Sequence, residues 1–433
     1  MYPSSGHTNG YHDQQQQQPE QQRFVTTAQR PRVRRGPRGG GGGGVRSRDY
    51  GDGFRVSGED NSQPPSQQAE QQNLAPCTDF DKAYFHSYAH VGIHEEMIKD
   101  RVRTDTYRSA ILQHQRHIEG KVVMDVGCGT GILAIFCAQA GAKRVYAVDA
   151  SDIAVQANEV VRANNLSDRI IVLHGRVEDV EIDEEVDVIV SEWMGYMLLY
   201  ESMLGSVITA RDRWLKPGGL ILPSHATLYM APITHPDRYT ESIDFWRNVY
   251  GIDMSAMLPL AKQCAFEEPS VETINGENVL TWPHVVKYVD CYTLQIYELE
   301  SVTTRFQFKS MMRAPFHGFA FWFDVEFNGP ANVNANAQIL LPGSPNPPSL
   351  DGVVKKKRTN PSDTLILSTA PEDPPTHWQQ TLIYFYEPME VEQDQVIEGS
   401  LTLSQSKENR RFMNIHLEYS SGGRSFVKES VMR

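Results

Sequence analysis

A glycine-rich run is the first segment of this chain with the residue types and spacing to hold a ligand. It reads Asp125-Val126-Gly127-Cys128-Gly129-Thr130-Gly131 and lies between a predicted strand, residues 121–126, and a predicted helix, residues 132–140. Glycine lets the backbone approach a ligand closely, and open α/β folds bind ligands at such strand-to-helix turns. Asp149 ends the next predicted strand, 22 residues after Gly127, where a carboxylate can accept hydrogen bonds from ribose hydroxyls.

The spacing of these glycines separates two kinds of cofactor. A dinucleotide-binding oxidoreductase would use the same architecture with the pattern G-x-G-x-x-G, whose last gap fits a pyrophosphate on the helix end. The pattern here is G-x-G-x-G. The tighter loop favours a cofactor without phosphates, S-adenosylmethionine. A purely structural glycine turn is the alternative, and the combination of strand, helix and acid argues against it.

Two glutamates bracket an apolar and aromatic stretch directly after another predicted strand, residues 186–191. Glu192 and Glu201 enclose Trp193, Met194, Tyr196 and other apolar residues. Carboxylates in such surroundings need a partner, because desolvation is costly. A guanidinium satisfies both through its planar fork of donors, whereas a nucleic-acid methylase would need amide groups for a neutral base. The pattern favours arginine as the acceptor; a surface loop with two solvated acids is the alternative.

Two further charged residues are candidates for the cofactor site. Glu178 follows the third predicted strand, residues 170–173, and could accept a hydrogen bond from an adenine amino group, although an exposed loop acid would look the same. Arg103 offers a cation for the methionyl carboxylate, and a surface charge on a helix is the alternative.

The rest of the sequence predicts the scaffold for these residues. Strands alternate with helices up to residue 222, which is typical of a doubly wound parallel sheet. Beyond it, runs such as 319–327, 381–386 and 413–419 follow one another without helices, which indicates an antiparallel barrel or sandwich. The predicted fold is therefore an α/β doubly wound parallel sheet followed by an antiparallel β-barrel-like domain.

The predicted segments differ in composition. A helical interruption after Pro236 is either a buried hairpin or an arm toward another subunit, and a Pro/Asn/Ser/Gly-rich stretch is expected to be a mobile insertion. The predicted boundaries are 1–78 for a disordered Gln/Gly/Arg-rich tail, 79–222 for an N-terminal helix and the cofactor domain, 223–433 for the β-rich domain, 236–262 for the arm and 329–363 for the insertion.

Charge is distributed unevenly along the chain. Residues 1–55 carry nine arginines and four acids, a charge of +5, so the remainder carries −18 of the net −13. An acidic body suits a cationic partner and opposes a phosphate backbone, although it also serves solubility alone; the tail could contact nucleic acid only weakly. Five scattered cysteines predict a reducing compartment, and no apolar run reaches the roughly 20 residues of a membrane span.

These motifs together resemble the protein arginine N-methyltransferases from about residue 79 to the C-terminus. The likeness is carried by the glycine run, the two-glutamate segment and Thr376-His377-Trp378. Met97, Met203 and a helix with Tyr84 and Tyr88 are similar to the type I branch, and residues 88–97 are similar to the plant enzymes of the member-6 group. The departures from the family lie in the tail and in the insertion after Phe327.

The resemblance implies a role for each matching residue. Glu192 and Glu201 would clamp the guanidinium for in-line methyl transfer, with His377 and Asp100 as a proton-handling dyad, although a lone histidine is more often structural. No metal is implied. The implied cofactor contacts are His94, Arg103, Asp125, Gly127, Gly129, Gly131, Asp149, Glu178 and Met203, and the implied substrate pocket is Tyr84, Tyr88, Met97 and Trp378.

The resemblance also implies partners. We expect S-adenosylmethionine to be converted to S-adenosylhomocysteine, arginine-rich substrates such as histone tails, and a head-to-tail homodimer formed through 236–262. Lys355 to Arg358 is either an import signal or a solvated loop, and we expect the nucleus and cytoplasm, with the nucleus favoured. The rival functions are a catalytically weak scaffold and a methyltransferase acting on a small cationic molecule.

Overall fold

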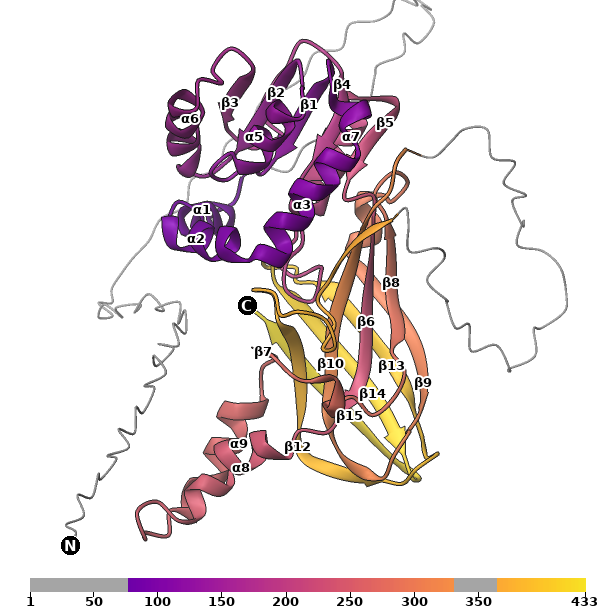
Figure 1. The fold of residues 1–433 in the computed structure, drawn as a ribbon. Helices are drawn as coiled ribbons and strands as arrows, with labels where there is room; N and C mark the ends of the chain where they lie inside the picture. The colour runs from indigo at the N-terminus through magenta and orange to yellow at the C-terminus, as the bar shows by residue number, and fades with distance from the viewer. Residues whose placement is uncertain (1–76, 331–363) are drawn as a thin grey trace, which may run out of the picture. The chain divides into compact units, whose positions relative to one another are not determined.

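The computed structural model describes residues 77–330 and 364–433. The predictions for the tail, for most of the insertion and for Lys355 to Arg358 therefore fall outside the described residues. The described chain begins with helices (Figure 1), the first of which is capped by Thr78: its side chain accepts the Asp81 amide, and the Asp81 carboxylate accepts the Thr78 amide. The helices are α1 (Asp79–Ser87), α2 (Val91–Lys99), α3 (Arg101–Gln113) and α4 (Gln115–Ile118).

A five-stranded parallel sheet follows, which confirms the predicted doubly wound fold. Its strand order is β3-β2-β1-β4-β5, and β1 is buried along its whole length, as expected for a sheet covered on both faces. Strand β5 was not predicted, because Pro217-Gly218-Gly219 inside it resembles a turn. The elements are β1 (Val122–Val126), α5 (Ile132–Gln139), β2 (Arg144–Asp149), α6 (Ile153–Ala163), β3 (Ile170–His174), β4 (Val186–Val190), α7 (Leu204–Trp214) and β5 (Leu215–Leu222).

The remainder is antiparallel β structure, again as predicted. One sheet has the order β7-β12-β10-β6-β8 with β11 paired to β10, and the other has the order β15-β14-β13-β9. Buried and exposed residues alternate along β14, so one face points to the core. The strands are β6 (His225–Ile233), β7 (Ser270–Glu272), β8 (His284–Asp290), β9 (Ser301–Lys309), β10 (Ala314–Phe327), β11 (Leu365–Ser368), β12 (Gln380–Val391), β13 (Val396–Gln405), β14 (Met413–Ser421) and β15 (Arg424–Met432).

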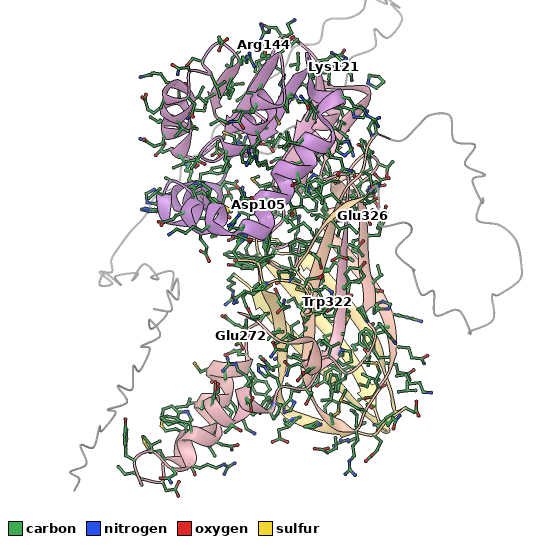
Figure 2. All side chains as sticks on the ribbon, viewed as in Figure 1. Asp105, Lys121, Arg144, Glu272, Trp322 and Glu326 are labelled. Carbon is green, nitrogen blue, oxygen red and sulfur yellow. The ribbon has the colours of Figure 1, made fainter. Side chains whose placement is uncertain are left out.

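A helical arm projects from this β domain between β6 and β7 (Figure 1). It contains α8 (Pro236–Ser242), a 3-10 turn (Asp244–Arg247) and α9 (Leu258–Phe266). The sequence pattern predicts a helix over 239–250, and this prediction was wrong: α8 ends at Ser242, a 3-10 turn replaces the next helical turn, and the backbone reverses at Tyr250, where φ is +53°. At the base of the arm, Arg238 pairs with Glu272 at 2.9 Å, and Glu272 is labelled there in Figure 2.

Candidate active site

The two predicted motifs meet at one edge of the parallel sheet. Strands β1 and β4 are neighbours, although β2 and β3 separate them in the chain, and the strand order reverses between them. Loops that leave the carboxyl ends of such neighbours diverge and form a ligand crevice. The loop after β1 is the glycine run, and the loop after β4 carries Glu192 and Glu201.

The glycine run forms the predicted turn between a strand and a helix. Gly127 and Gly129 have φ values of +73° and +54°, the left-handed region that favours glycine. A Cβ on Gly127 would clash with the Met203 side chain, and a Cβ on Gly129 would lie 3.0 Å from the imidazole of His94. The run therefore brings Met203, at the end of the glutamate segment, and His94, on α2, to the same place.

Asp149 binds back to the glycine run. Its Oδ2 accepts the amide of Gly129 at 2.8 Å. Its Oδ1 accepts the amide of Ser151 at 2.8 Å and the Ser151 hydroxyl at 2.6 Å. Each carboxylate oxygen can accept two hydrogen bonds, so Oδ2 keeps the capacity for a further donor such as a ribose hydroxyl.

Arg103 and Glu192 form a buried ion pair. The Nε atom of Arg103 donates to Oε2 of Glu192 at 3.0 Å, and the two side chains are only 6% and 8% exposed. Nη1 of Arg103 donates to the carbonyl of Met97 at 3.2 Å. The second oxygen of Glu192, Oε1, is buried and has no hydrogen-bond partner among the described residues. The candidate cofactor residue Arg103 thus contacts the candidate clamp directly.

Asp125, at the end of β1, is the most desolvated acid of the site. It is fully buried, and neither carboxylate oxygen has a partner of normal hydrogen-bond geometry within the described residues. Burial raises the pKa of Asp125 to about 7, which the nearby amide of Ala134 offsets only in part. The charged form is therefore poised to be stabilised by a cationic ligand group.

The segment that holds Glu201 is folded tightly. Met197, Leu198 and Glu201 all have positive φ values, from +51° to +64°, which cost non-glycine residues about 1 kcal/mol or more each. Burial raises the pKa of the Glu201 carboxyl, against a hydrogen bond from Tyr200 and the charge of Arg411. Strained residues persist where their surroundings fix them, and they cluster at functional sites.

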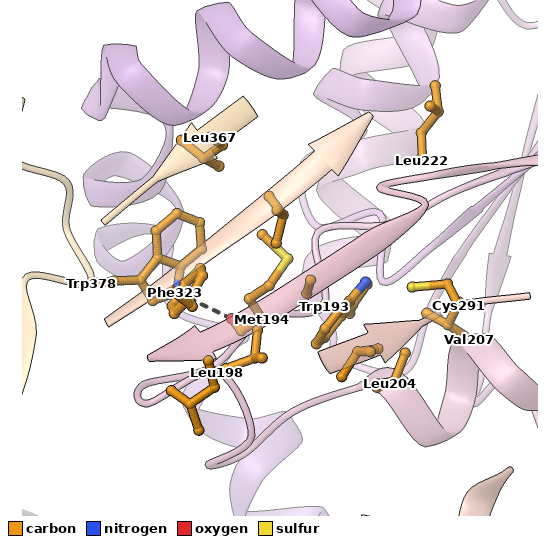
Figure 3. Close-up of a cluster of buried hydrophobic side chains, with 14 of the residues drawn as sticks. Trp193, Met194, Leu198, Leu204, Val207, Leu222, Cys291, Phe323, Leu367 and Trp378 are labelled. Atoms are coloured by element: carbon orange, nitrogen blue, oxygen red, sulfur yellow. Dashed lines mark hydrogen bonds between the residues drawn. The ribbon is translucent and has the colours of Figure 1, made fainter. Parts of the chain in front are cut away.

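His377 and Asp100 lie together, as the family resemblance implied. Nδ1 and the amide of His377 are 2.7 and 2.9 Å from Oδ2 of Asp100. Against the effect of burial, hydrogen bonds from His377 and from the Arg103 amide lower the pKa of Asp100. Next to them, Nε1 of Trp378 donates to the carbonyl of Met194 at 3.1 Å, the dashed line in Figure 3. The β domain thereby touches both α3 and the glutamate segment.

Arg411 is a site residue that sequence reasoning missed. It lies between β13 and β14, and its guanidinium stands 3.7 Å from the ring centroid of Tyr84 and pairs with Asp81 at 3.0 Å. Tyr84 in turn packs against Tyr88, with ring centroids 4.7 Å apart, and burial raises the pKa of Tyr84 to about 12. No local signal marks a turn arginine more than 300 residues from its partner.

The chain is similar to known methyltransferases in both of its domains. Residues 224–347 and 356–424 match the arginine methyltransferase oligomerization subdomain, and residues 108–224 match the model of ribosomal protein L11 methyltransferase. The chain is 80% identical over 361 residues to a probable protein arginine N-methyltransferase 6 of Arabidopsis thaliana, which covers 83% of each chain. It is 45% identical over 348 residues to protein arginine N-methyltransferase 6 of Xenopus laevis, 79% of this chain and 92% of the relative.

This chain belongs to the protein arginine N-methyltransferase family. Solved structures agree. The Trypanosoma brucei PRMT1 enzyme–prozyme heterotetrameric complex with AdoHcy matches with a TM-score of 0.67 and 34% identity, over 80% of this chain and 100% of that one. Arabidopsis thaliana protein arginine methyltransferase 10 matches with a TM-score of 0.66 and 36% identity, over 81% and 100%. As a methyltransferase of this family, the chain also matches an oligomerization subdomain, which indicates that it forms oligomers.

The predicted cofactor of this methyltransferase, S-adenosylmethionine, is consistent with the AdoHcy in the solved relative. The residues present fit such a molecule: a Cβ on Gly127 or Gly129 would meet Met203 or His94, Asp149 keeps an acceptor position, and among the described residues the buried Asp125 carboxylate has no hydrogen-bond partner of normal geometry. Glu178 takes no part in these contacts, and its carboxylate accepts a hydrogen bond from Ser206 on α7 at 2.6 Å.

Residues 77–330 and 364–433 include no group of three or more His, Cys, Asp or Glu side chains placed to hold a metal ion. Across the same residues, every helix is too short or too polar to cross a membrane.

Proposed function

We propose that this methyltransferase is a type I enzyme that acts on arginine-rich proteins such as histone tails and forms monomethylarginine and asymmetric dimethylarginine. The observation that carries the proposal is Glu192, a buried carboxylate with one oxygen on Arg103 and the other without a partner among the described residues. A buried anionic oxygen that lacks a donor favours a cationic ligand with N–H groups, and a guanidinium is such a ligand.

In the mechanism we propose, Glu192 and Glu201 hold the substrate guanidinium. S-adenosylmethionine, when bound, supplies a methyl group on a sulfonium. The two carboxylates draw positive charge toward the nitrogens that they bond, which leaves the third nitrogen richer in electrons. Because the pKa of a guanidinium is above about 12, the substrate does not lose its proton before attack, and the proton leaves during or after methyl transfer. A fixed orientation in a pocket that excludes water supplies much of the acceleration.

His377 and Asp100 would handle the proton that the substrate loses. The 2.7 Å contact from Nδ1 fixes the ring, so that Nε2 is the atom left to accept a proton. Met97 and Met203 would shape the space beside the acceptor nitrogen and permit a second methylation there. Support for Met203 comes from its position against Gly127.

The test measures transfer of labelled methyl groups to a histone and to a Gly/Arg-rich protein, followed by chromatography of the arginine products. Glu192→Gln should bind the cofactor and lose transfer. Glu181→Gln is the matched control, since that side chain is 81% exposed and pairs with Arg213 on the surface. Symmetric dimethylarginine would refute the type I assignment, and transfer by Glu192→Gln would refute the clamp.

We also propose that the oligomer is a head-to-tail dimer formed through the arm. Tyr250 is 99% exposed, and Ile252, Leu260 and Phe245 are each more than half exposed on the arm. Apolar side chains gathered on a projecting element are typical of an interface. Light scattering at micromolar concentration should give twice the monomer mass, and Ile252→Asp should reduce it. A monomeric wild-type mass would contradict the proposal.

A further inference from the structure

The carbonyl oxygen of Tyr88 is approached by two buried side chains. Nε2 of His94 lies 2.8 Å from it, and Oγ of Ser151 lies 3.5 Å from it. His94 is 4% exposed and Ser151 is 2% exposed. The His94 contact is local, between the end of α1 and α2, whereas Ser151 follows β2 and belongs to the parallel sheet domain. Ser151 therefore lies between the Tyr88 carbonyl and the end of β2.

The Ser151 hydroxyl has one hydrogen and two acceptors. Oδ1 of Asp149 lies 2.6 Å away and the Tyr88 oxygen lies 3.5 Å away. A short hydrogen bond to a carboxylate is roughly twice as strong as one between neutral groups, and 3.5 Å is the outer limit of hydrogen bonding. In this structure the hydrogen therefore belongs to Asp149, and the Tyr88 carbonyl is held by His94.

We propose that Ser151 is a positioning residue that couples the occupation of Asp149 to the corner between α1 and α2. The inference rests on the proposed function, in which Asp149 accepts a hydroxyl group of the cofactor. A second strong donor on Asp149 weakens its hold on the Ser151 hydrogen. The hydroxyl then turns to the Tyr88 carbonyl, and this draws α1, with Tyr84 and Tyr88, toward the end of β2.

Amide hydrogen exchange of residues 84–94 tests this coupling, with S-adenosylhomocysteine as the probe at a concentration that calorimetry shows to be saturating for each variant. In the wild type the probe should slow exchange there about three- to tenfold, the effect of one hydrogen bond. Ser151→Ala should lose most of this protection while protection of the glycine run persists. Equal protection of residues 84–94 in Ser151→Ala, or none in the wild type, would overturn the proposal.

Ser206→Ala is the matched control. Its hydroxyl also bonds an acid of the candidate cofactor site, Glu178 at 2.6 Å, but it lies on α7 and not beside the end of β2. We expect it to weaken cofactor binding and to keep the protection of residues 84–94. Loss of that protection in both variants would overturn the specific role of Ser151.

A second measurement separates this inference from the proposed function. The affinity for an arginine-rich peptide is measured with and without S-adenosylhomocysteine, and the ratio should fall toward one in Ser151→Ala but not in Ser206→Ala. If the wild type fails to bind the peptide under both conditions, the proposed substrate is refuted, and the exchange result alone then decides on Ser151. A ratio that Ser151→Ala leaves at the wild-type value would count against the coupling.

Discussion

Replacing Glu192 by methionine should destabilise the fold by about 3–5 kcal/mol, the cost of leaving a buried ionic partner without its counter-charge. The Arg103 side chain is 6% exposed, and its remaining hydrogen bonds go to the Met97 carbonyl and the Thr104 hydroxyl, which are neutral. Arg103→Met should cost a similar amount, because it strands a carboxylate that already has one unpartnered oxygen. The double variant removes both charges and keeps most of the side-chain volume, so its cost should be within about 2 kcal/mol of wild type.

Urea denaturation followed by tryptophan fluorescence measures these three differences, with unchanged slopes as the check that unfolding stays comparable. The coupling free energy of the pair is the amount by which the double variant is more stable than the sum of the singles predicts. All three variants should lose methyl transfer. Single costs below about 1 kcal/mol, or strictly additive costs, would refute the description of Arg103 and Glu192 as a desolvated pair.

Three further predictions concern single residues. The folded pKa of Asp125, about 7, lies above its ordinary 3.8, so the folded state binds the proton more tightly. As the pH rises from about 4 to 7, the free energy of unfolding of the wild type should therefore fall by up to about 1.4 kcal/mol per pH unit. Asp125→Asn should remove this pH dependence, which urea denaturation at several pH values measures. Trp378→Phe strands the buried Met194 carbonyl, which should cost about 1–2 kcal/mol in urea denaturation and lower kcat more than it raises KM. Lys428→Met removes the donor to the Phe266 carbonyl at 2.7 Å, so amide exchange in α9 should accelerate about five- to tenfold.

The parts of the fold that local sequence could predict are those in which local chemistry decides the structure. The glycine run was predicted to form the turn between a strand and a helix, and it follows β1 in the structure, where glycine adopts the positive φ values freely. The arm was harder to predict, since residues 239–250 have a helical pattern although α8 ends at Ser242 and only a 3-10 turn follows it. Strand β5 was missed because Pro217-Gly218-Gly219 lies at a register shift in the pairing with β4, where Gly218 keeps a positive φ of +76°, so a turn signal stands inside the strand.

Long-range partners were beyond what local spacing could supply. Arg103 and Glu192 were each singled out, one for the cofactor and one for the substrate, yet their pairing spans 89 residues and only the folded chain reveals it. The same holds for Arg411 on Tyr84. His377 and Asp100 were paired by resemblance alone, since 277 residues separate them and no periodicity relates them.

The ion pair between Arg103 and Glu192 changes how the two halves of the site relate. Arg103 uses Nε for Glu192 and Nη1 for neutral oxygens, and Nη2 makes no hydrogen bond to the described residues. Glu192 uses Oε2 and leaves Oε1 free. One buried pair therefore offers a cationic donor and an anionic acceptor. A ligand carboxylate beside Arg103 adds negative charge, which favours a guanidinium beside Glu192, and the guanidinium favours the carboxylate in the same way. The low dielectric constant of a buried site strengthens both effects. Binding at the two halves should accordingly be cooperative, so each ligand should bind more tightly when the other is present.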